Sequence, residues 1–147
     1  MTENSKINEA VKYFEGDWNC CQSIIMTYGP QYGLPKDTSA HMGTSFAGGM
    51  ARRGEVCGAV TGALMIIGLK YGMTNETDSQ ARDKTYELVN EFMDTFKAKH
   101  ESLRCRDLLD CDLTTAEGRK TAQDKGLFKT LCPELVKSAA EILEELI

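Results

Sequence analysis

The apolar residues of this chain recur at intervals of three and four positions, and the alternation typical of β-strands is nearly absent. Spacing of this kind places apolar side chains along one face of an α-helix. Only three prolines are available to interrupt such helices. The sequence therefore predicts an all-α fold, a compact helical bundle, and its 147 residues suit one domain over 1–147.

A helix over about residues 56–71 is expected to form the centre of the bundle. Its apolar side chains lie nearly all round the helix axis, and a helix without a polar face is buried. Three further helices are predicted before it, from Ile7 to Phe14, from a cap at Asp17 to Tyr28, and from Thr38 or Ser39 through Met50. After a polar loop over 73–80, a long helix is predicted to end at His100, followed by a short helix through Leu109. One short helix is predicted within 112–126, and the last helix is predicted to begin at Pro133. Gly43, Gly48 and Gly49 disfavour the helix through Met50, because glycine costs roughly 1 kcal/mol against alanine inside a helix.

Charge and hydropathy exclude two classes of partner. The net charge is −5, and the only basic cluster, Arg52-Arg53, is too short to follow a phosphate backbone, so we expect no nucleic acid. The longest apolar stretch, Ala63 to Leu69, is far shorter than the ~20 residues that cross a bilayer, so we expect no membrane span. The first residues also lack a basic segment followed by an apolar run, which predicts a cytoplasmic protein.

The six cysteines are then the main carriers of chemistry. Thiols in the cytoplasm stay reduced by default, so cysteines there indicate metal binding or redox chemistry more than a disulfide framework. No Cys-x-x-Cys pair is present, and the spacing of Cys105 and Cys111 matches no ferredoxin pattern. Any shared site must therefore be assembled from distant segments. The two histidines, His41 and His100, stand apart, which argues against a histidine-metal hydrolase.

Cys57 is the most informative of the six. It lies at the predicted start of the central helix, in the segment Cys57-Gly58-Ala59-Val60-Thr61-Gly62. The free N–H groups and the dipole at a helix start favour a thiolate. Gly58 and Gly62, four residues apart on one face, would allow another helix or a cofactor to come within backbone contact. The alternative for this segment is close helix packing with one buried cysteine.

Two further cysteines occupy positions that favour reactivity. Cys132 precedes Pro133, so it would fall at the cap of the last helix, where its sulfur can face the first amides. Cys105 has Arg104 and Arg106 as neighbours, and we expect these cations to lower the pKa of its thiol.

The remaining three cysteines divide into one candidate and two extras. Cys20 lies at the edge of an apolar stripe, where it can face a site, whereas Cys21 lies within the stripe and is expected to fill the core. Cys111 is six residues beyond Cys105, so on one helix the two would point in opposing directions unless the helix breaks between them.

The chain resembles the C-GCAxxG-C-C family, to which redox activity is ascribed. The segments that carry the resemblance are Asn19-Cys20-Cys21-Gln22, the core Cys57-Gly58-Ala59-Val60-Thr61-Gly62, Cys105-Arg106-Asp107-Leu108-Leu109 and Cys132. They span nearly the whole chain and select Cys20, Cys57, Cys105 and Cys132 as one set. The domain of this family is similar to the cysteine-bearing part of certain multihaem cytochromes, which implies an iron–sulfur centre and electron transfer.

Three hypotheses follow for this four-cysteine set. In the first, the four thiolates hold an iron–sulfur cluster of the [2Fe–2S] type for electron transfer, with helix starts and Arg104 or Arg106 offsetting its charge. In the second, the protein is a metal-free thiol–disulfide redox protein without a cofactor, and Cys57 is the nucleophile. In the third, the site is a structural zinc site, or the chain is a partner-binding bundle without catalysis.

The first two hypotheses make the protein an oxidoreductase or an electron-transfer protein, and both require a redox partner protein. The large number of apolar helices in so small a chain also favours a homodimer.

Overall fold

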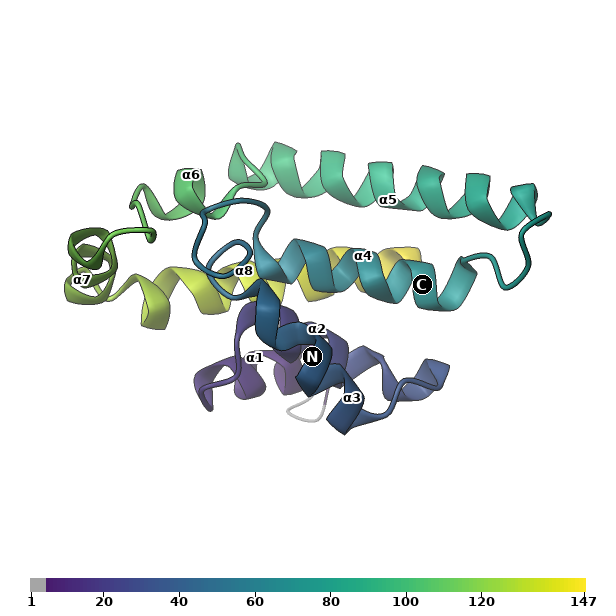
Figure 1. The fold of residues 1–147 in the computed structure, drawn as a ribbon, viewed down its shortest axis with the longest axis horizontal. Coiled ribbons are helices and arrows are strands. Elements are labelled where there is room, and N and C mark those ends of the chain that lie inside the picture. The colour runs from purple at the N-terminus through teal and green to yellow at the C-terminus, as the bar shows by residue number, and fades with distance from the viewer. Residues whose placement is uncertain (1–4) are drawn as a thin grey trace.

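Helices form along most of the chain in a computed structural model that describes residues 5–147 (Figure 1). The elements are α1 (Lys6–Glu15), α2 (Cys20–Tyr28), the 3-10 turn η1 (Pro30–Tyr32), α3 (Lys36–Gly43), the 3-10 turn η2 (Thr44–Phe46), α4 (Gly58–Tyr71), α5 (Ser79–His100), α6 (Cys105–Leu109), α7 (Ala116–Asp124) and α8 (Leu127–Leu146). No strand occurs within 5–147, so the predicted all-α fold is confirmed.

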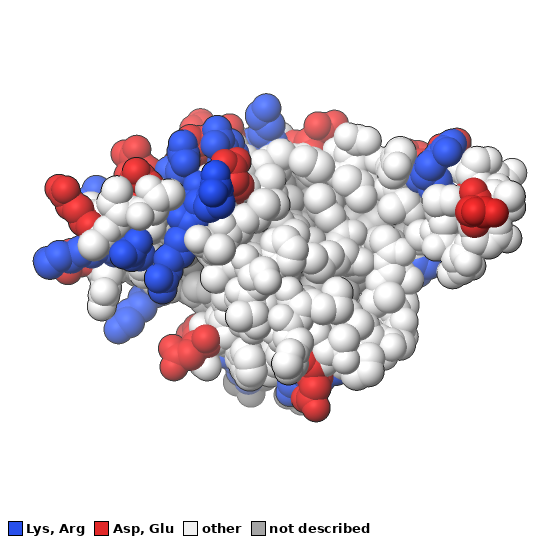
Figure 2. Space-filling view, in the orientation of Figure 1, with Lys and Arg blue, Asp and Glu red and all other residues white. Residues whose placement is uncertain are grey.

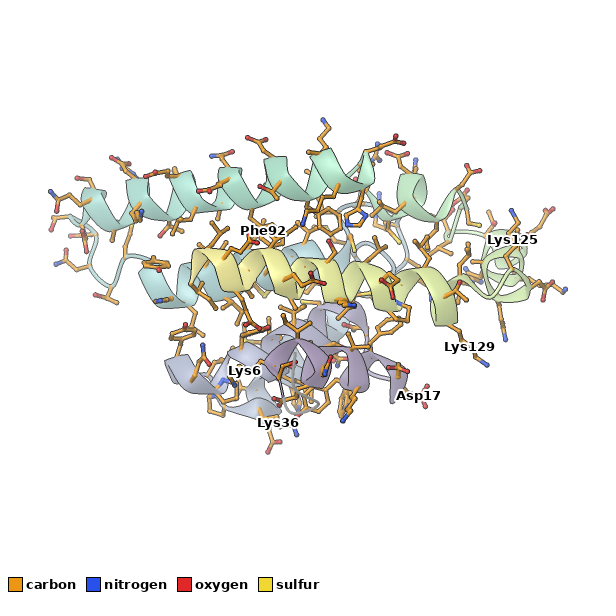
Figure 3. All side chains as sticks on the ribbon, turned by 180° about the vertical axis from the view of Figure 1, so that it is seen from behind. Lys6, Asp17, Lys36, Phe92, Lys125 and Lys129 are labelled. Atoms are coloured by element: carbon orange, nitrogen blue, oxygen red, sulfur yellow. The ribbon has the colours of Figure 1, made fainter. Side chains whose placement is uncertain are left out.

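Helix α4 lies at the centre of the bundle. It packs against α2, α5 and α8, and its side chains Val60, Ala63, Ile66 and Ile67 are fully buried. Helices α4, α5 and α8 run along the long axis, while α1 to α3 cover one side (Figure 1). From α5, Phe92 points into the space towards α8 (Figure 3) and is fully buried. The prediction of a buried central helix is confirmed, because no face of α4 is polar enough to prefer water.

The cap of helix α2 lies two residues after its predicted position. Asn19 is the capping residue, and its side chain accepts a hydrogen bond of 2.8 Å from the Gln22 N–H. The Gln22 side chain in turn accepts from the Asn19 N–H at 3.0 Å. Asp17 instead has a left-handed backbone (φ 79°) and belongs to the turn after α1. The prediction of a cap at Asp17 is wrong because this reciprocal pair satisfies two free N–H groups, which one aspartate would not.

The predicted helix from Thr38 through Met50 is also wrong in both bounds. Helix α3 begins at Lys36, directly after Pro35, and ends at Gly43. Beyond η2, the five residues 48–52 all have a positive φ, so they form a left-handed turn. Such a turn cannot continue a right-handed helix, and its first two positions are glycines, for which this conformation is not strained.

The last helix begins at Leu127 rather than at Pro133, so Cys132 lies inside α8 and not at its cap. Pro133 has no N–H and removes one hydrogen bond from the second turn. Leu127 and Leu131 nevertheless pack against the small buried cluster that contains Cys132. This packing extends the helix in front of the proline. The short helix expected within 112–126 is confirmed as α7.

Charged side chains are unevenly distributed on the visible face. They gather at the end that holds α6 and α7, whereas the middle of this face, over α4, carries almost no charge (Figure 2). Across the described part of the chain, no helix combines the length and the apolar character needed to cross a bilayer. The homodimer stays a prediction.

Candidate functional site, a cavity lined by four cysteines

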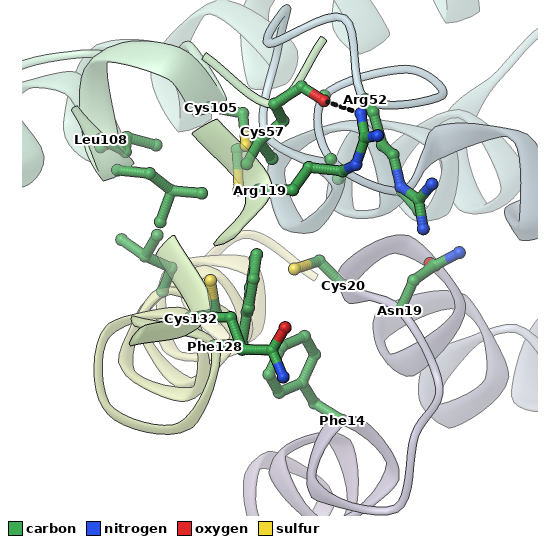
Figure 4. A pocket seen from close by; sticks show the side chains of 18 of the residues that line it. Phe14, Asn19, Cys20, Arg52, Cys57, Cys105, Leu108, Arg119, Phe128 and Cys132 are labelled. Atoms are coloured by element: carbon green, nitrogen blue, oxygen red, sulfur yellow. Dashed lines mark hydrogen bonds between the residues drawn. The ribbon is translucent and has the colours of Figure 1, made fainter. Parts of the chain in front are cut away.

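Four cysteines from four separate elements line one cavity of about 620 Å³ (Figure 4). Cys20 is the first residue of α2, Cys57 is the capping residue of α4, Cys105 is the first residue of α6, and Cys132 lies in α8. Cys20 is half-buried and the other three are buried. The structure thus brings the four predicted cysteines together.

Two backbone hydrogen bonds place Cys57 beside Cys105. The Cys57 N–H donates to the Leu103 carbonyl at 2.8 Å, and the Cys105 N–H donates to the Glu55 carbonyl at 2.7 Å. These bonds form a single antiparallel bridge between the segment before α4 and the segment before α6. The bridge explains how residues 48 positions apart, 57 and 105, reach the same wall of the cavity.

The glycines of the core motif bring α2 and α4 together. A Cβ atom on Gly58 would lie 3.2 Å from the Cβ of Cys20, and one on Gly62 would lie 3.0 Å from the Cβ of Ile24. The neighbour that approaches both glycines is therefore helix α2. Gly58 also lines the cavity. Because α2 comes this close, Cys20 lies directly across from Cys57.

The surroundings of Cys57 favour its thiolate. The Cys20 thiol and the backbone N–H groups of Ala59 and Val60 face the Cys57 sulfur. These three donors lower the pKa of Cys57 below its ordinary value, although burial opposes them. This direction agrees with the expectation that the start of the central helix favours a thiolate.

Two other thiols of the cavity wall, those of Cys20 and Cys105, are held in the neutral form. The neighbouring Cys132 and Cys57 thiols, together with burial, raise the pKa of Cys20 well above its ordinary value. Burial raises the pKa of Cys105 to about 12. The expectation that two arginines lower the Cys105 pKa is wrong. Arg104 pairs with Glu55 at 3.4 Å, and Arg106 donates to the carbonyl of Arg53 at 3.0 Å.

Two cations of the cavity wall were not predicted from the sequence. Arg52 and Arg119 line the cavity, whereas Arg104 and Arg106 do not. Arg119 donates to the Leu113 carbonyl at 2.9 Å, which fixes its guanidinium beside the thiols (Figure 4). The basic pair Arg52-Arg53 was visible in the sequence, but only the left-handed turn selects which of the two faces the cavity.

The two extra cysteines lie outside the cavity lining. Cys21 is fully buried in the main core, as expected, and burial raises its pKa to about 12. Helix α6 ends at Leu109, and Asp110 is left-handed, so the helix does break before Cys111. Cys111 then joins Cys105 and Cys132 in a small buried cluster rather than pointing away from them.

Four thiols are the donors that a [2Fe–2S] cluster or a Cys₄ zinc site takes. Their number and chemical kind therefore fit either group. Their spacing does not fit a single ion, since four sulfurs about 2.3 Å from one zinc lie close to one another. Among residues 5–147, no three His, Cys, Asp or Glu side chains are placed so that they could hold a metal ion.

A family model matches residues 18–146 and is described as "Putative redox-active protein (C_GCAxxG_C_C)". The chain belongs to this family. The matched region includes all four cysteines of the cavity, and the resemblance seen in the sequence is confirmed. The family label writes its core as Gly-Cys-Ala, whereas this chain has the order Cys57-Gly58-Ala59. No curated protein and no solved structure matches the chain significantly.

These pKa directions predict the order in which a small neutral alkylating reagent labels the thiols. Cys57 is expected to react first at pH 7, because its pKa is lowered whereas the pKa values of Cys20 and Cys105 are raised. Its labelling rate should level off at a lower pH than the labelling rate of Cys105, which should continue to rise up to a pH of about 12. Timed iodoacetamide labelling with peptide mass spectrometry measures both curves. Equal rates at all cysteines would contradict the arrangement.

Proposed function

We propose that this protein is a thiol–disulfide redox protein in which Cys57 is the nucleophile and Cys20 resolves the mixed disulfide. The observation that carries the proposal is the contact between these two thiols. The Cys20 thiol, which faces Cys57, lowers the pKa of Cys57, while Cys132, Cys57 and burial raise the pKa of Cys20 itself. A stabilised thiolate beside a protonated thiol is the pairing that such exchange uses.

The exchange begins when the Cys57 thiolate attacks one sulfur of a substrate disulfide. A Cys57–substrate disulfide forms, and the other half of the substrate leaves as a thiolate that takes up a proton. Cys57 then no longer carries a negative charge. Because the negative charge of Cys57 is one cause of the raised Cys20 pKa, the loss of that charge lowers the Cys20 pKa again. Cys20 can then lose its proton.

In the second step the Cys20 thiolate attacks the Cys57 sulfur. A Cys20–Cys57 disulfide forms, and the second half of the substrate leaves as a thiol. Two electrons pass from the two protein thiols to the substrate disulfide, and a dithiol of a partner protein must return them in the next cycle. Gly58, which follows Cys57 in the chain, lies against Cys20, so the start of α4 and the start of α2 are close together at this place.

The variant Cys20→Ser is expected to stop the reaction after its first step. Cys57 should still attack, but without a resolving thiol the mixed disulfide should accumulate to nearly one per chain. With bis(2-hydroxyethyl) disulfide as the probe, intact-mass spectrometry would show the chain with one added 2-hydroxyethylthiol group. The wild-type chain should instead lose two hydrogen atoms. The matched control, Cys21→Ser, should behave as wild type. A wild-type chain that stays fully reduced, with no adduct in Cys20→Ser, would contradict the proposal.

A second candidate function is an iron–sulfur centre for electron transfer, held by Cys20, Cys57, Cys105 and Cys132. It is favoured by the common cavity of the four cysteines and by the two arginines that would offset the cluster's negative charge. A bound cluster would supply one-electron chemistry. The chain would contribute the four ligands, and the buried walls of the cavity would limit the access of water.

One measurement separates the two functions and a zinc site. Protein purified without air is analysed for iron, acid-labile sulfide and zinc, and its visible spectrum is recorded. Iron and sulfide in equal amounts would favour the cluster, and one zinc per chain without a redox response would favour a structural site. A colourless protein with none of these, even after cluster reconstitution, would favour thiol–disulfide exchange. If the protein contains no metal and shows no thiol–disulfide exchange, the function that remains is that of a partner-binding bundle.

A further inference from the structure

We infer that the cysteine cavity takes a small disulfide that carries a carboxylate, with Arg52 and Arg119 binding the carboxylate while a substrate sulfur reaches Cys57. The disulfide part of this inference rests on the proposed function. The anion-binding part does not, because it depends only on the charges of the cavity wall. Each part therefore has its own experiment.

The cavity has the size and the two-sided wall of a small-molecule site. Its volume of about 620 Å³ lies in the range of ligand pockets, roughly 300–1,000 Å³. One part of the wall is apolar and includes Phe14, Leu108 and Phe128, whereas the two arginines lie on another side (Figure 4). A ligand with an apolar body and one anionic end matches this division.

The charge of the cavity wall favours an anion. Among the described residues that line it, Arg52 and Arg119 are the cations, and Asp17, which is exposed, is the only carboxylate. Within residues 5–147 the ion pairs are Arg82–Asp83, Arg104–Glu55 and Lys120–Asp124, so none involves Arg52, Arg119 or Asp17. The planar guanidinium fork matches a carboxylate with two parallel hydrogen bonds. Arg52 therefore has its whole fork available for a ligand.

A strained backbone places Arg52 at this wall. Residues 48–52 are all left-handed, and three of them, Met50, Ala51 and Arg52, are not glycine. Each such residue costs roughly 1–2 kcal/mol. The turn is closed by hydrogen bonds from the Arg52 N–H to the Ala47 carbonyl at 2.8 Å and from the Gly54 N–H to the Gly48 carbonyl at 3.1 Å. Strain that is held in place beside reactive groups is typical of functional sites.

Activation of Cys57 does not account for these arginines. The groups that lower the Cys57 pKa are the Cys20 thiol and the backbone N–H groups of Ala59 and Val60. The guanidinium groups are not among them. Their place in the wall, with no carboxylate paired to them, is explained by a ligand that brings its own negative charge.

The first experiment compares two alkylating reagents of nearly equal size, iodoacetate and iodoacetamide, at Cys57. The rate ratio of the anionic to the neutral reagent is measured on the folded chain and divided by the same ratio for the chain in urea. We expect a quotient of about ten in wild type, a fall to about one in Arg52→Gln, and no change in the matched control Arg53→Gln. A wild-type quotient near one, or equal loss in both variants, would overturn the anion site.

The second experiment compares three disulfides of similar length in a single turnover. They are 3,3′-dithiodipropionate, which is anionic, bis(2-hydroxyethyl) disulfide, which is neutral, and cystamine, which is cationic. We expect the anionic probe to oxidise the Cys20–Cys57 pair fastest, and its advantage over the neutral probe to be lost in Arg52→Gln but kept in Arg53→Gln.

The outcomes separate failure of this inference from failure of the proposed function. If all three disulfides oxidise the pair at equal rates, thiol–disulfide exchange stands and the anionic substrate class is overturned. If none of the three disulfides reacts, but iodoacetate still labels Cys57 faster than iodoacetamide, both the disulfide substrate and the proposed exchange are refuted. Only the anion site then remains.

Discussion

Cys57→Ser is expected to reduce the rate of disulfide exchange about a thousandfold or more, because a serine hydroxyl does not ionise near neutral pH. The neighbouring thiols are poor substitutes. Cys20 and Cys105 are both held in the neutral form, the second with a pKa of about 12. Release of thiol from bis(2-hydroxyethyl) disulfide at pH 7, followed in a single turnover, measures the loss.

The control for this variant is Cys111→Ser. Cys111 is buried like Cys57 but lies outside the cavity, so its replacement should leave the exchange rate within about twofold of wild type. Thermal unfolding of both variants checks that the fold is kept. If Cys57→Ser retained most of the fast exchange in a folded chain, another cysteine would be the nucleophile and the assignment would be wrong.

Gly62→Val is expected to destabilise the fold by about 3 kcal/mol, which is more than a hundredfold in the folding equilibrium. A Cβ atom at Gly62 would already lie 3.0 Å from the Ile24 Cβ and 3.1 Å from the Cys21 carbonyl oxygen. The two further methyl groups of valine would push α2 away from α4. Urea unfolding followed by circular dichroism measures the change in the free energy of unfolding.

The matched control for this change is Gly68→Val in the same helix. A Cβ atom at Gly68 would meet nothing within 4 Å, so valine there should change the stability by less than about 0.5 kcal/mol. Both variants place valine inside α4, and helix propensity therefore cancels between them. Equal destabilisation would show that glycine is not required for the α2–α4 contact. Because that contact also sets Cys20 opposite Cys57, Gly62→Val should slow disulfide exchange as well.

The sequence by itself determined the helical elements, because helix formation depends on the spacing of apolar residues within a few turns. The buried helix near 56–71 and the short helix within 112–126 follow from such local patterns. It also determined which cysteines to consider, since Cys57 lies at the start of the most apolar helix and the other motifs repeat those of a known family.

Two of the bounds that were wrong also involve contacts with other segments. Helix α8 extends in front of Pro133 because Leu127 and Leu131 pack on a cluster formed with α6 and the residues after it. The cap at Asn19 depends on its reciprocal pair with Gln22, whose amide also donates to the Ala40 carbonyl at 2.8 Å. The spacing of apolar residues in the sequence predicts neither of these contacts.

Only the tertiary structure decided which neighbour stabilises the Cys57 thiolate, which thiols stay neutral and which cations line the cavity. Cys105 has two arginine neighbours in sequence, yet burial holds its thiol neutral, while Cys57 gains its thiolate character from Cys20 on another helix. Arg52, rather than Arg53, faces the cavity because a left-handed turn directs it there. The physical reason is that pKa values and charge placement follow from distances and burial in the folded chain, and sequence neighbours do not fix either quantity.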